Sequence, residues 1–340
     1  MNEETIKLVK QLLNTPKKIV VVGHKNPDGD ALGSCLGLSI FLKHLGHYPT
    51  VIMPNDFPDF LKWLPENESI VIHEKEVEKS TEAIENAEVI FTLDFNMLNR
   101  VGDLEVPLKE SSASFIMIDH HQQPGDYAAA TYSDTTMSST AEMVYHFIAA
   151  LEKTDLINAD IATNLYTGIM TDTGSFRFPS TSALTHKVIA HLIESGANNS
   201  DIHQNIYDTN SPDRLKLLGV ALKNLVILPK HRTAYITLTQ KDLDEHNFRK
   251  GDTEGFVNYA LSVSDIVFAV IFIENKQENI VKISLRSKGN FSVNEFARNH
   301  YNGGGHTNAA GGRSSLALDN TITEFISILP DYNIALQNAT

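Results

Sequence analysis

Cysteine is almost absent from this sequence, and long hydrophobic runs are missing. The chain of 340 residues has one cysteine, Cys35, which excludes an internal disulfide. No apolar stretch approaches the roughly 20 residues that a membrane-spanning helix needs. Positive charge is also scarce, because 28 Lys and Arg stand against 42 Asp and Glu, a net charge of −14. These shortages predict a cytoplasmic protein that has no membrane partner and binds no long duplex nucleic acid, since the latter requires a basic surface.

The length predicts two domains. In the first, residues 1–196, short apolar segments alternate with helical ones, which predicts an α/β fold with a mostly parallel sheet flanked by helices. A polar helical connector follows at residues 197–228. Residues 229–340 are expected to form a smaller α/β domain.

The most informative stretch is Ile19–Ser34, IVVVGHKNPDGDALGS. Its first four residues are apolar and β-branched, as in a buried strand of a parallel sheet. A loop with His24, Asp28 and Asp30 follows, and then a helix. Ligands of open α/β sheets bind at this carboxyl end of the strands. Asn-Pro-Asp-Gly is also strong turn chemistry by itself, so an ordinary Asx turn is the alternative interpretation.

Two further apolar segments end in the same kind of side chain. Val89–Leu93 is followed by Asp94, and Phe115–Ile118 is followed by Asp119-His120-His121. A helix over 160–170 runs into Thr171-Asp172-Thr173-Gly174, which places Asp172 on a glycine-bearing turn. Parallel strands share one carboxyl edge, so these groups are expected to meet there.

The converging side chains are carboxylates with a minority of imidazoles and no thiolate. This set suits Mn²⁺, Mg²⁺ or a similar divalent ion better than a structural zinc site. The candidates are too many for one ion and fit two, with Asp94 as a bridging carboxylate: His24, Asp28, Asp30, Asp94, Asp119, His120, His121 and Asp172. Two ions that clamp the attacking and leaving oxygens of a displacement favour phosphoester or phosphoanhydride hydrolysis.

These motifs resemble the DHH phosphoesterase family. The first motif is His24–Ser34, the second is the isolated Asp94, the third is Asp119–His121, and the fourth is Asp172–Phe176. The GGGH segment Gly303–His306, followed by AAGG, looks like the DHH-associated domain. The resemblance covers nearly the whole chain with its motifs in family order.

The resemblance implies a role for each site residue. His24, Asp28 and Asp94 would hold one metal ion, and Asp30, Asp94, His120 and Asp172 would hold the other. The two expected catalytic residues are Asp119, which would orient a ligand imidazole, and His121, which would face the substrate phosphate or protonate the leaving group.

In the second domain, the resemblance implies that Arg286 and the loop Gly303–His306 would bind the far end of the substrate, and the active site is therefore expected in the cleft between the two domains. The alternatives are a structural hydrogen-bonded role for His121, a simple tight turn for Gly303–Gly305, and a solvated strand-end cation for Arg286. Arg100, just past Asp94, could reach substrate or form an exposed salt bridge.

Within the family, the stand-alone architecture is most similar to small enzymes that cleave very short oligoribonucleotides and dephosphorylate adenosine 3′,5′-bisphosphate. The resemblance implies hydrolysis by a water activated by two divalent ions, Mn²⁺ first and Mg²⁺ or Co²⁺ as options. The alternatives are an exopolyphosphatase or pyrophosphatase, a phosphodiesterase of linear or cyclic dinucleotides, and a non-enzymatic RNA-binding scaffold. The sequence leaves the oligomeric state open, with a homodimer as one option.

Overall fold

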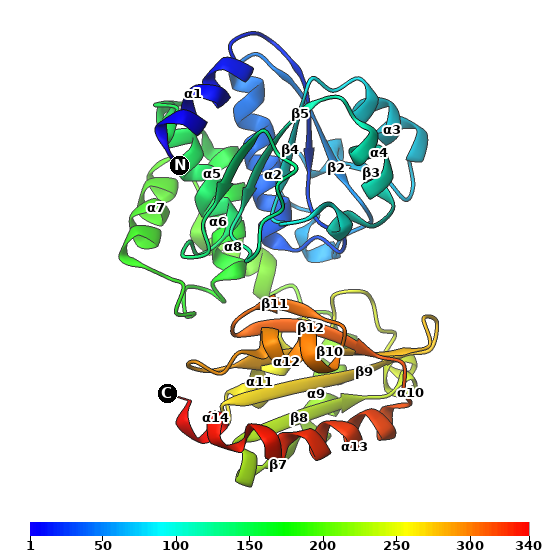
Figure 1. The fold of residues 1–340 in the computed structure, drawn as a ribbon. Coiled ribbons are helices and arrows are strands. Elements are labelled where there is room, and N and C mark those ends of the chain that lie inside the picture. The colour runs from blue at the N-terminus through cyan, green and yellow to red at the C-terminus, as the bar shows by residue number, and fades with distance from the viewer. Residues whose placement is uncertain (340) are drawn as a thin grey trace. The chain divides into compact units, whose positions relative to one another are not determined.

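The computed structural model describes residues 1–339, which divide into two compact units. The first unit is Met1–Thr209, and the second begins at Asn210 (Figure 1). Each unit is built on a six-stranded sheet with helices on its faces. Within residues 1–339, no helix combines the length and the hydrophobicity needed to cross a membrane.

The sheet of the first unit is entirely parallel, with the strand order β3-β2-β1-β4-β5-β6. Its strands are β1 (Lys18–Val22), β2 (Tyr48–Met53), β3 (Val71–Ile72), β4 (Val89–Leu93), β5 (Ser114–Asp119) and β6 (Ala130–Ser133). Strands β2 and β3 lie on one side of β1, whereas β4, β5 and β6 lie on its other side. The switch point of the topology therefore lies between β1 and β4, where open α/β sheets bind ligands.

The apolar run of β1 is continuous because both faces of the sheet are covered. Ile19 and Val21 belong to the core shared with α2, whereas Val20 and Val22 belong to the core on the opposite face. The first core also receives side chains from α1, α5, α6, α7 and α8, and the second from α3 and α4. The helices are α1 (Glu3–Leu12), α2 (Gly29–His44), α3 (Val77–Glu85), α4 (Glu105–Glu110), α5 (Thr140–Ala150), α6 (Ala159–Asp172), α7 (Ala183–Glu194) and α8 (Asn199–Tyr207).

The second unit has a mixed sheet with the strand order β11-β12-β10-β9-β8-β7. Only β8 and β9 pair in parallel, and all other neighbours are antiparallel. Its strands are β7 (Val226–Leu228), β8 (Thr233–Leu238), β9 (Phe268–Asn275), β10 (Ile280–Ser287), β11 (Gly304–His306) and β12 (Ala309–Ser314). One face packs against α9 (Pro212–Lys223), α10 (Gln240–Glu245) and α11 (Phe256–Leu261), and the other against α12 (Val293–His300), α13 (Leu318–Ile328) and α14 (Asn333–Asn338).

The expected α/β class and the parallel first sheet are confirmed. Two local expectations were wrong. Asp172 is the last residue of α6 and precedes the glycine-bearing turn. Gly304–His306 is a strand paired with β12, where we expected a loop, because Gly303 and Gly305 let the two backbones approach closely. A Cβ on Gly303 would lie 1.9 Å from the carbonyl oxygen of Gly311, so only glycine fits there.

The close packing of α2 on α6 generates a prediction about Gly33. A Cβ at this position would lie 2.3 Å from the backbone oxygen of Asn164, and backbone cannot move aside as a flexible side chain can. We expect Gly33→Ala to destabilise the protein by about 3 kcal/mol, as measured by chemical unfolding. The control is Gly219→Ala at an exposed position of helix α9, where no atom outside the adjacent helix backbone lies within 4 Å of the added Cβ. This control should be neutral or slightly stabilising, and an equal effect of both substitutions would contradict the packing argument.

Candidate functional site

The polar groups follow three neighbouring strands at one edge of the parallel sheet. His24 lies two residues beyond β1, Asp94 follows β4 directly, and Asp119 is the last residue of β5. Because β1, β4 and β5 are adjacent and parallel, these groups meet at the switch point. His24, Asp94 and Asp119 are all buried, although each is polar or ionisable. Buried polar groups need polar partners. Here the polar side chains form two clusters, one around His24 and one around His120.

The first group surrounds the Nε2 atom of His24. This atom lies 3.4 Å from Asp94 Oδ2 and 3.8 Å from Asp28 Oδ1. On the other side of the ring, Nδ1–H donates to the carbonyl oxygen of Lys25 at 2.9 Å. A carbonyl only accepts, so the proton of the neutral ring lies on Nδ1 and the lone pair of Nε2 faces the carboxylates.

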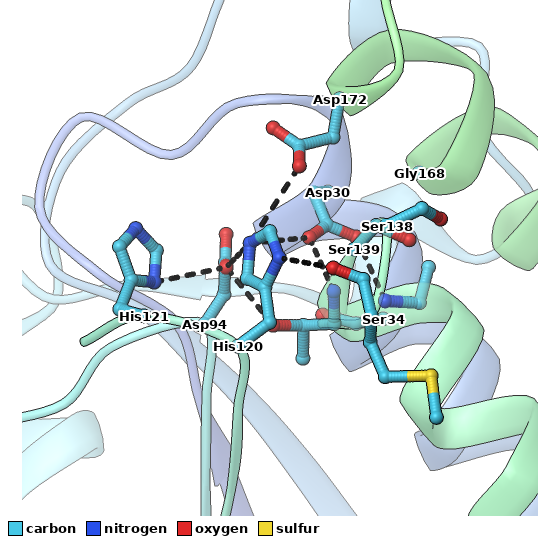
Figure 2. Close-up of polar contacts among 12 residues, drawn as sticks. Asp30, Ser34, Asp94, His120, His121, Ser138, Ser139, Gly168 and Asp172 are labelled. Atoms are coloured by element: carbon cyan, nitrogen blue, oxygen red, sulfur yellow. Dashed lines mark hydrogen bonds and ion pairs between the residues drawn. The ribbon is translucent and has the colours of Figure 1, made fainter. Parts of the chain in front are cut away.

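The second group surrounds the Nε2 atom of His120. It lies 3.6 Å from Asp94 Oδ1, 3.6 Å from Asp172 Oδ2 and 3.8 Å from Asp30 Oδ2. Figure 2 shows these carboxylates turned toward the His120 ring from different elements. The Nδ1–H of His120 donates to the carbonyl oxygen of Met137 at 3.3 Å, so its Nε2 also presents a lone pair.

These distances fit ligands around a common cation better than hydrogen bonds. They range from 3.4 to 3.8 Å, whereas an N–H···O hydrogen bond is about 2.9 Å long. The two oxygens of Asp94 face different imidazoles, as expected of a carboxylate that bridges two ions. The structure thus brings together all six expected metal ligands: His24, Asp28, Asp30, Asp94, His120 and Asp172.

Asp119 and His121 form a hydrogen-bonded pair beside these two groups. Asp119 is fully buried, and its Oδ1 accepts from the Nδ1–H of His121 at 2.7 Å. His121 Nδ1 also lies 3.7 Å from Asp94 Oδ1. We expected Asp119 to orient a ligand imidazole, but the observed partner is His121, and His120 is oriented by the Met137 carbonyl.

Like charges and burial shift the pKa values of the cluster. Burial, reinforced by Asp94, Asp172 and Asp28, raises the pKa of Asp30 well above its usual range. Burial also raises the pKa of Asp172, to about 6, although His120 opposes this shift. Asp30 and Asp172 therefore resist ionising beside the other carboxylates, and a bound cation would relieve this repulsion.

The pKa values of His24 and His121 are raised, which favours the positively charged form of each ring. Burial alone would lower the pKa of His24, but the nearby carboxylates of Asp28 and Asp94 raise it well above 6.5. The pKa of His121 is also raised, because Asp119 and Asp94 outweigh the effects of burial and of the Arg100 charge. Protons on the rings thus take the place of cations in balancing the carboxylates.

Helix α5 holds the carboxylates in place, a contribution that the sequence did not reveal. The backbone N–H groups of Thr140 and Ala141 donate to Asp30 Oδ2 and Oδ1 at 2.7 and 2.8 Å. The Thr140 hydroxyl donates to Asp94 Oδ1 at 3.0 Å. The segment Ser138-Ser139-Thr140 indicated only a helix start, because nothing in its local pattern points to an acid 110 residues earlier.

Asp94 adopts a backbone conformation that non-glycine residues avoid. Its φ is +66°, in the left-handed region. Its N–H donates to the carbonyl oxygen of Ile118 in β5 at 3.2 Å, which fixes the turn at the strand end. Such strain costs about 1–3 kcal/mol and is concentrated at functional sites.

The substrate-binding candidates of the second unit lie on the interior strand β10 and at the edge strand β11 of its sheet. In the strand register, Arg286 pairs with Ala309, and Ala309 pairs with His306. Residues directly opposite each other point to the same face, so Arg286 and His306 share one face of the sheet, two strands apart. The Gly305 N–H donates to Asn294 Oδ1 at 3.0 Å, and Asn294 also accepts from Arg298 at 3.2 Å.

Comparisons with known proteins agree with this arrangement. Residues 18–169 match the DHH family, N-terminal domain, and residues 232–332 match the DHHA1 domain. Two relatives share the name bifunctional oligoribonuclease and PAP phosphatase NrnA. The one from Thermus thermophilus is 32% identical, covering 91% of this chain and 88% of its own. The one from Bacillus subtilis is 30% identical, covering 86% and 88%.

A solved structure is similar over nearly the full length. The crystal structure of an exopolyphosphatase-related protein from Bacteroides fragilis superposes with a TM-score of 0.95 at 37% identity. The match covers 99% of this chain and 98% of that chain. The chain therefore belongs to the DHH family and is a hydrolase of phosphoester bonds.

Proposed function

We propose that this chain hydrolyses very short oligoribonucleotides and removes the 3′-phosphate of adenosine 3′,5′-bisphosphate. The observation that carries the proposal is the paired cluster around His24 and His120 with Asp94 between them. The names of the relatives from Thermus thermophilus and Bacillus subtilis, each matched over more than four-fifths of its length, support this choice of substrates. The single buried cysteine is compatible with the cytoplasm as the place where it acts.

The donor set fits two divalent ions, and we propose Mn²⁺ as the preferred one. His24, Asp28 and Asp94 would hold the first ion, and Asp30, Asp94, His120 and Asp172 the second. Oxygen donors with one imidazole at each site suit Mn²⁺, and Mg²⁺ or Co²⁺ would also fit. When bound, the ions supply Lewis acidity at the phosphoryl group and lower the pKa of water.

His121 is proposed to handle the proton of the leaving group. The Asp119 carboxylate holds Nδ1–H and fixes the direction of the ring. Asp119 and Asp94 raise the pKa of His121 and thereby favour its imidazolium form. Its Nε2–H is then available to protonate the departing alkoxide, as a general acid does. In the second unit, Arg286 and Gly303–His306 are proposed to contact the nucleotide part of the substrate.

The substrate proposal is tested by turnover of a panel with Mn²⁺. We expect the highest kcat/KM for diribonucleotides and adenosine 3′,5′-bisphosphate, and much lower values for long RNA, pyrophosphate and polyphosphate. Asp94→Asn should reduce every activity about a thousandfold or more, since two ions lose their shared ligand. A preference for pyrophosphate or polyphosphate would refute the substrate assignment. RNA binding without hydrolysis, unchanged in Asp94→Asn, would favour the scaffold alternative.

The raised pKa of Asp172 generates a prediction about stability. Its folded pKa of about 6 exceeds the ordinary 3.8, so its favourable contribution is present below about pH 4 and is lost as the pH rises through 6. With metal removed by EDTA at neutral pH, Asp172→Asn should therefore stabilise the protein by about 2–3 kcal/mol. The gain should vanish near pH 4, where Asp172 is protonated, and added Mn²⁺ should stabilise the variant less than the wild type.

The control for this prediction is Asp160→Asn in the first turn of the same helix. Asp160 is exposed and lies at the favourable end of the α6 dipole, so its loss should be neutral or slightly destabilising. The measurement is denaturant unfolding of the three proteins with EDTA and with Mn²⁺. If Asp172→Asn lowers the metal-free stability at neutral pH, the carboxylates of the site do not repel one another as described.

A further inference from the structure

Arg100 lies at the same sheet edge as the metal-ligand cluster. It belongs to the 3₁₀ segment η3 (Leu98–Leu104), which follows β4 and Asp94. Its carbonyl oxygen accepts from the N–H of Lys25 at 2.9 Å, which ties η3 to the loop of His24 and Asp28. On the other side, Asn96 donates through Nδ2 to the carbonyl oxygen of Gln122 at 2.6 Å, directly after His121. The carbonyl of Arg100 thus ties it to the loop of His24, and the residues just before η3 are tied to the loop that follows His121.

The packing of η3 places a second cation at this edge. Gly102 has φ +60° and ψ −128°, which breaks the helical path in the middle of η3. A Cβ on Gly102 would lie 2.9 Å from Cδ of Lys25 and 3.3 Å from its Nζ, so the lysine side chain lies against the glycine. Lys25 and Arg100 therefore bring two positive charges to an edge that otherwise gathers carboxylates.

The guanidinium of Arg100 has no fixed partner among residues 1–339. It is exposed, and none of the hydrogen bonds or ion pairs of the described chain involves it. Other arginines of the chain are engaged: Arg177 donates to the Gly174 carbonyl, and Arg232 donates to three carbonyls near the C-terminal helix. Its charge nevertheless acts on His121, where it opposes the rise in pKa that Asp119 and Asp94 cause. In a chain with a net charge of −14, an unpaired arginine beside the proposed general acid points to an anionic ligand.

We propose that Arg100 binds the phosphoryl group that is hydrolysed, on the side of His121. This inference rests on the proposed function and adds a substrate-binding residue to it. A planar guanidinium donates two parallel hydrogen bonds to phosphate oxygens, which also fixes the orientation of the phosphate. It also offsets the repulsion that a phosphate anion experiences from the buried carboxylates.

The experiment compares Arg100→Gln, Arg100→Lys and the control Lys7→Gln, which removes one exposed charge from α1. Mn²⁺ affinity is measured by calorimetry, inhibition by inorganic phosphate is measured on the Mn²⁺-loaded enzyme, and kcat and KM are measured with a diribonucleotide. For Arg100→Gln we expect kcat/KM to fall and the phosphate inhibition constant to rise about 10- to 100-fold, the range for hydrogen bonds to charged groups. Arg100→Lys should recover part of this loss, and Mn²⁺ affinity should stay within about twofold of the wild type.

Two results would overturn the assignment. One is a phosphate inhibition constant in Arg100→Gln equal to that of Lys7→Gln. The other is a parallel loss of Mn²⁺ affinity, which would make Arg100 a structural support of the metal loops. If no ribonucleotide is turned over, calorimetric titration of the Mn²⁺-loaded proteins with inorganic phosphate replaces inhibition. Weaker phosphate binding by Arg100→Gln would then support the role of Arg100, even though the proposed substrates would be refuted.

Discussion

The repulsion among buried carboxylates is the constraint on which the first unit depends. Asp94 is the centre of this cluster, since its two oxygens face His24 and His120 separately. Placing acids so close together is unfavourable unless positive charge or hydrogen-bond donors compensate. Within the chain, the compensation comes from the imidazoles and from the N-terminal N–H groups of α5, which bind both oxygens of Asp30. The fold thus keeps a candidate cation site assembled at a cost to its own stability, as functional sites often do.

The parallel sheet explains why this cluster could be anticipated from the sequence. A buried strand followed at once by Asp or His is a local pattern, and the parallel order sends all such ends to one edge. This reasoning predicts the positions of His24, Asp94 and Asp119, and the resemblance to the DHH family implies which residues would share a metal ion. The sequence therefore predicted both the class of the first unit and the residues that meet at its switch point.

Other features depend on contacts that no local pattern encodes. The hydroxyl of Thr140 and the first N–H groups of α5 donate to Asp94 and Asp30, which lie far away in the sequence. The local pattern of Ser138-Ser139-Thr140 predicts only the start of a helix. The glycines of Gly303–Gly305 are expected to bind phosphate, and the structure adds a second reason for two of them, because a Cβ on Gly303 or Gly305 would meet the backbone of the neighbouring strand β12. The partner of Asp119 depended on the orientation of two successive histidine rings, which the sequence does not specify.

The central claim is that Asp94 joins two cation sites in one cluster. It is tested most directly by the anomalous diffraction of crystals grown with Mn²⁺. The structure predicts two manganese peaks per chain, one beside His24 Nε2 and one beside His120 Nε2, with one oxygen of Asp94 on each. A single peak, or two peaks of which neither is bound by Asp94, would contradict it.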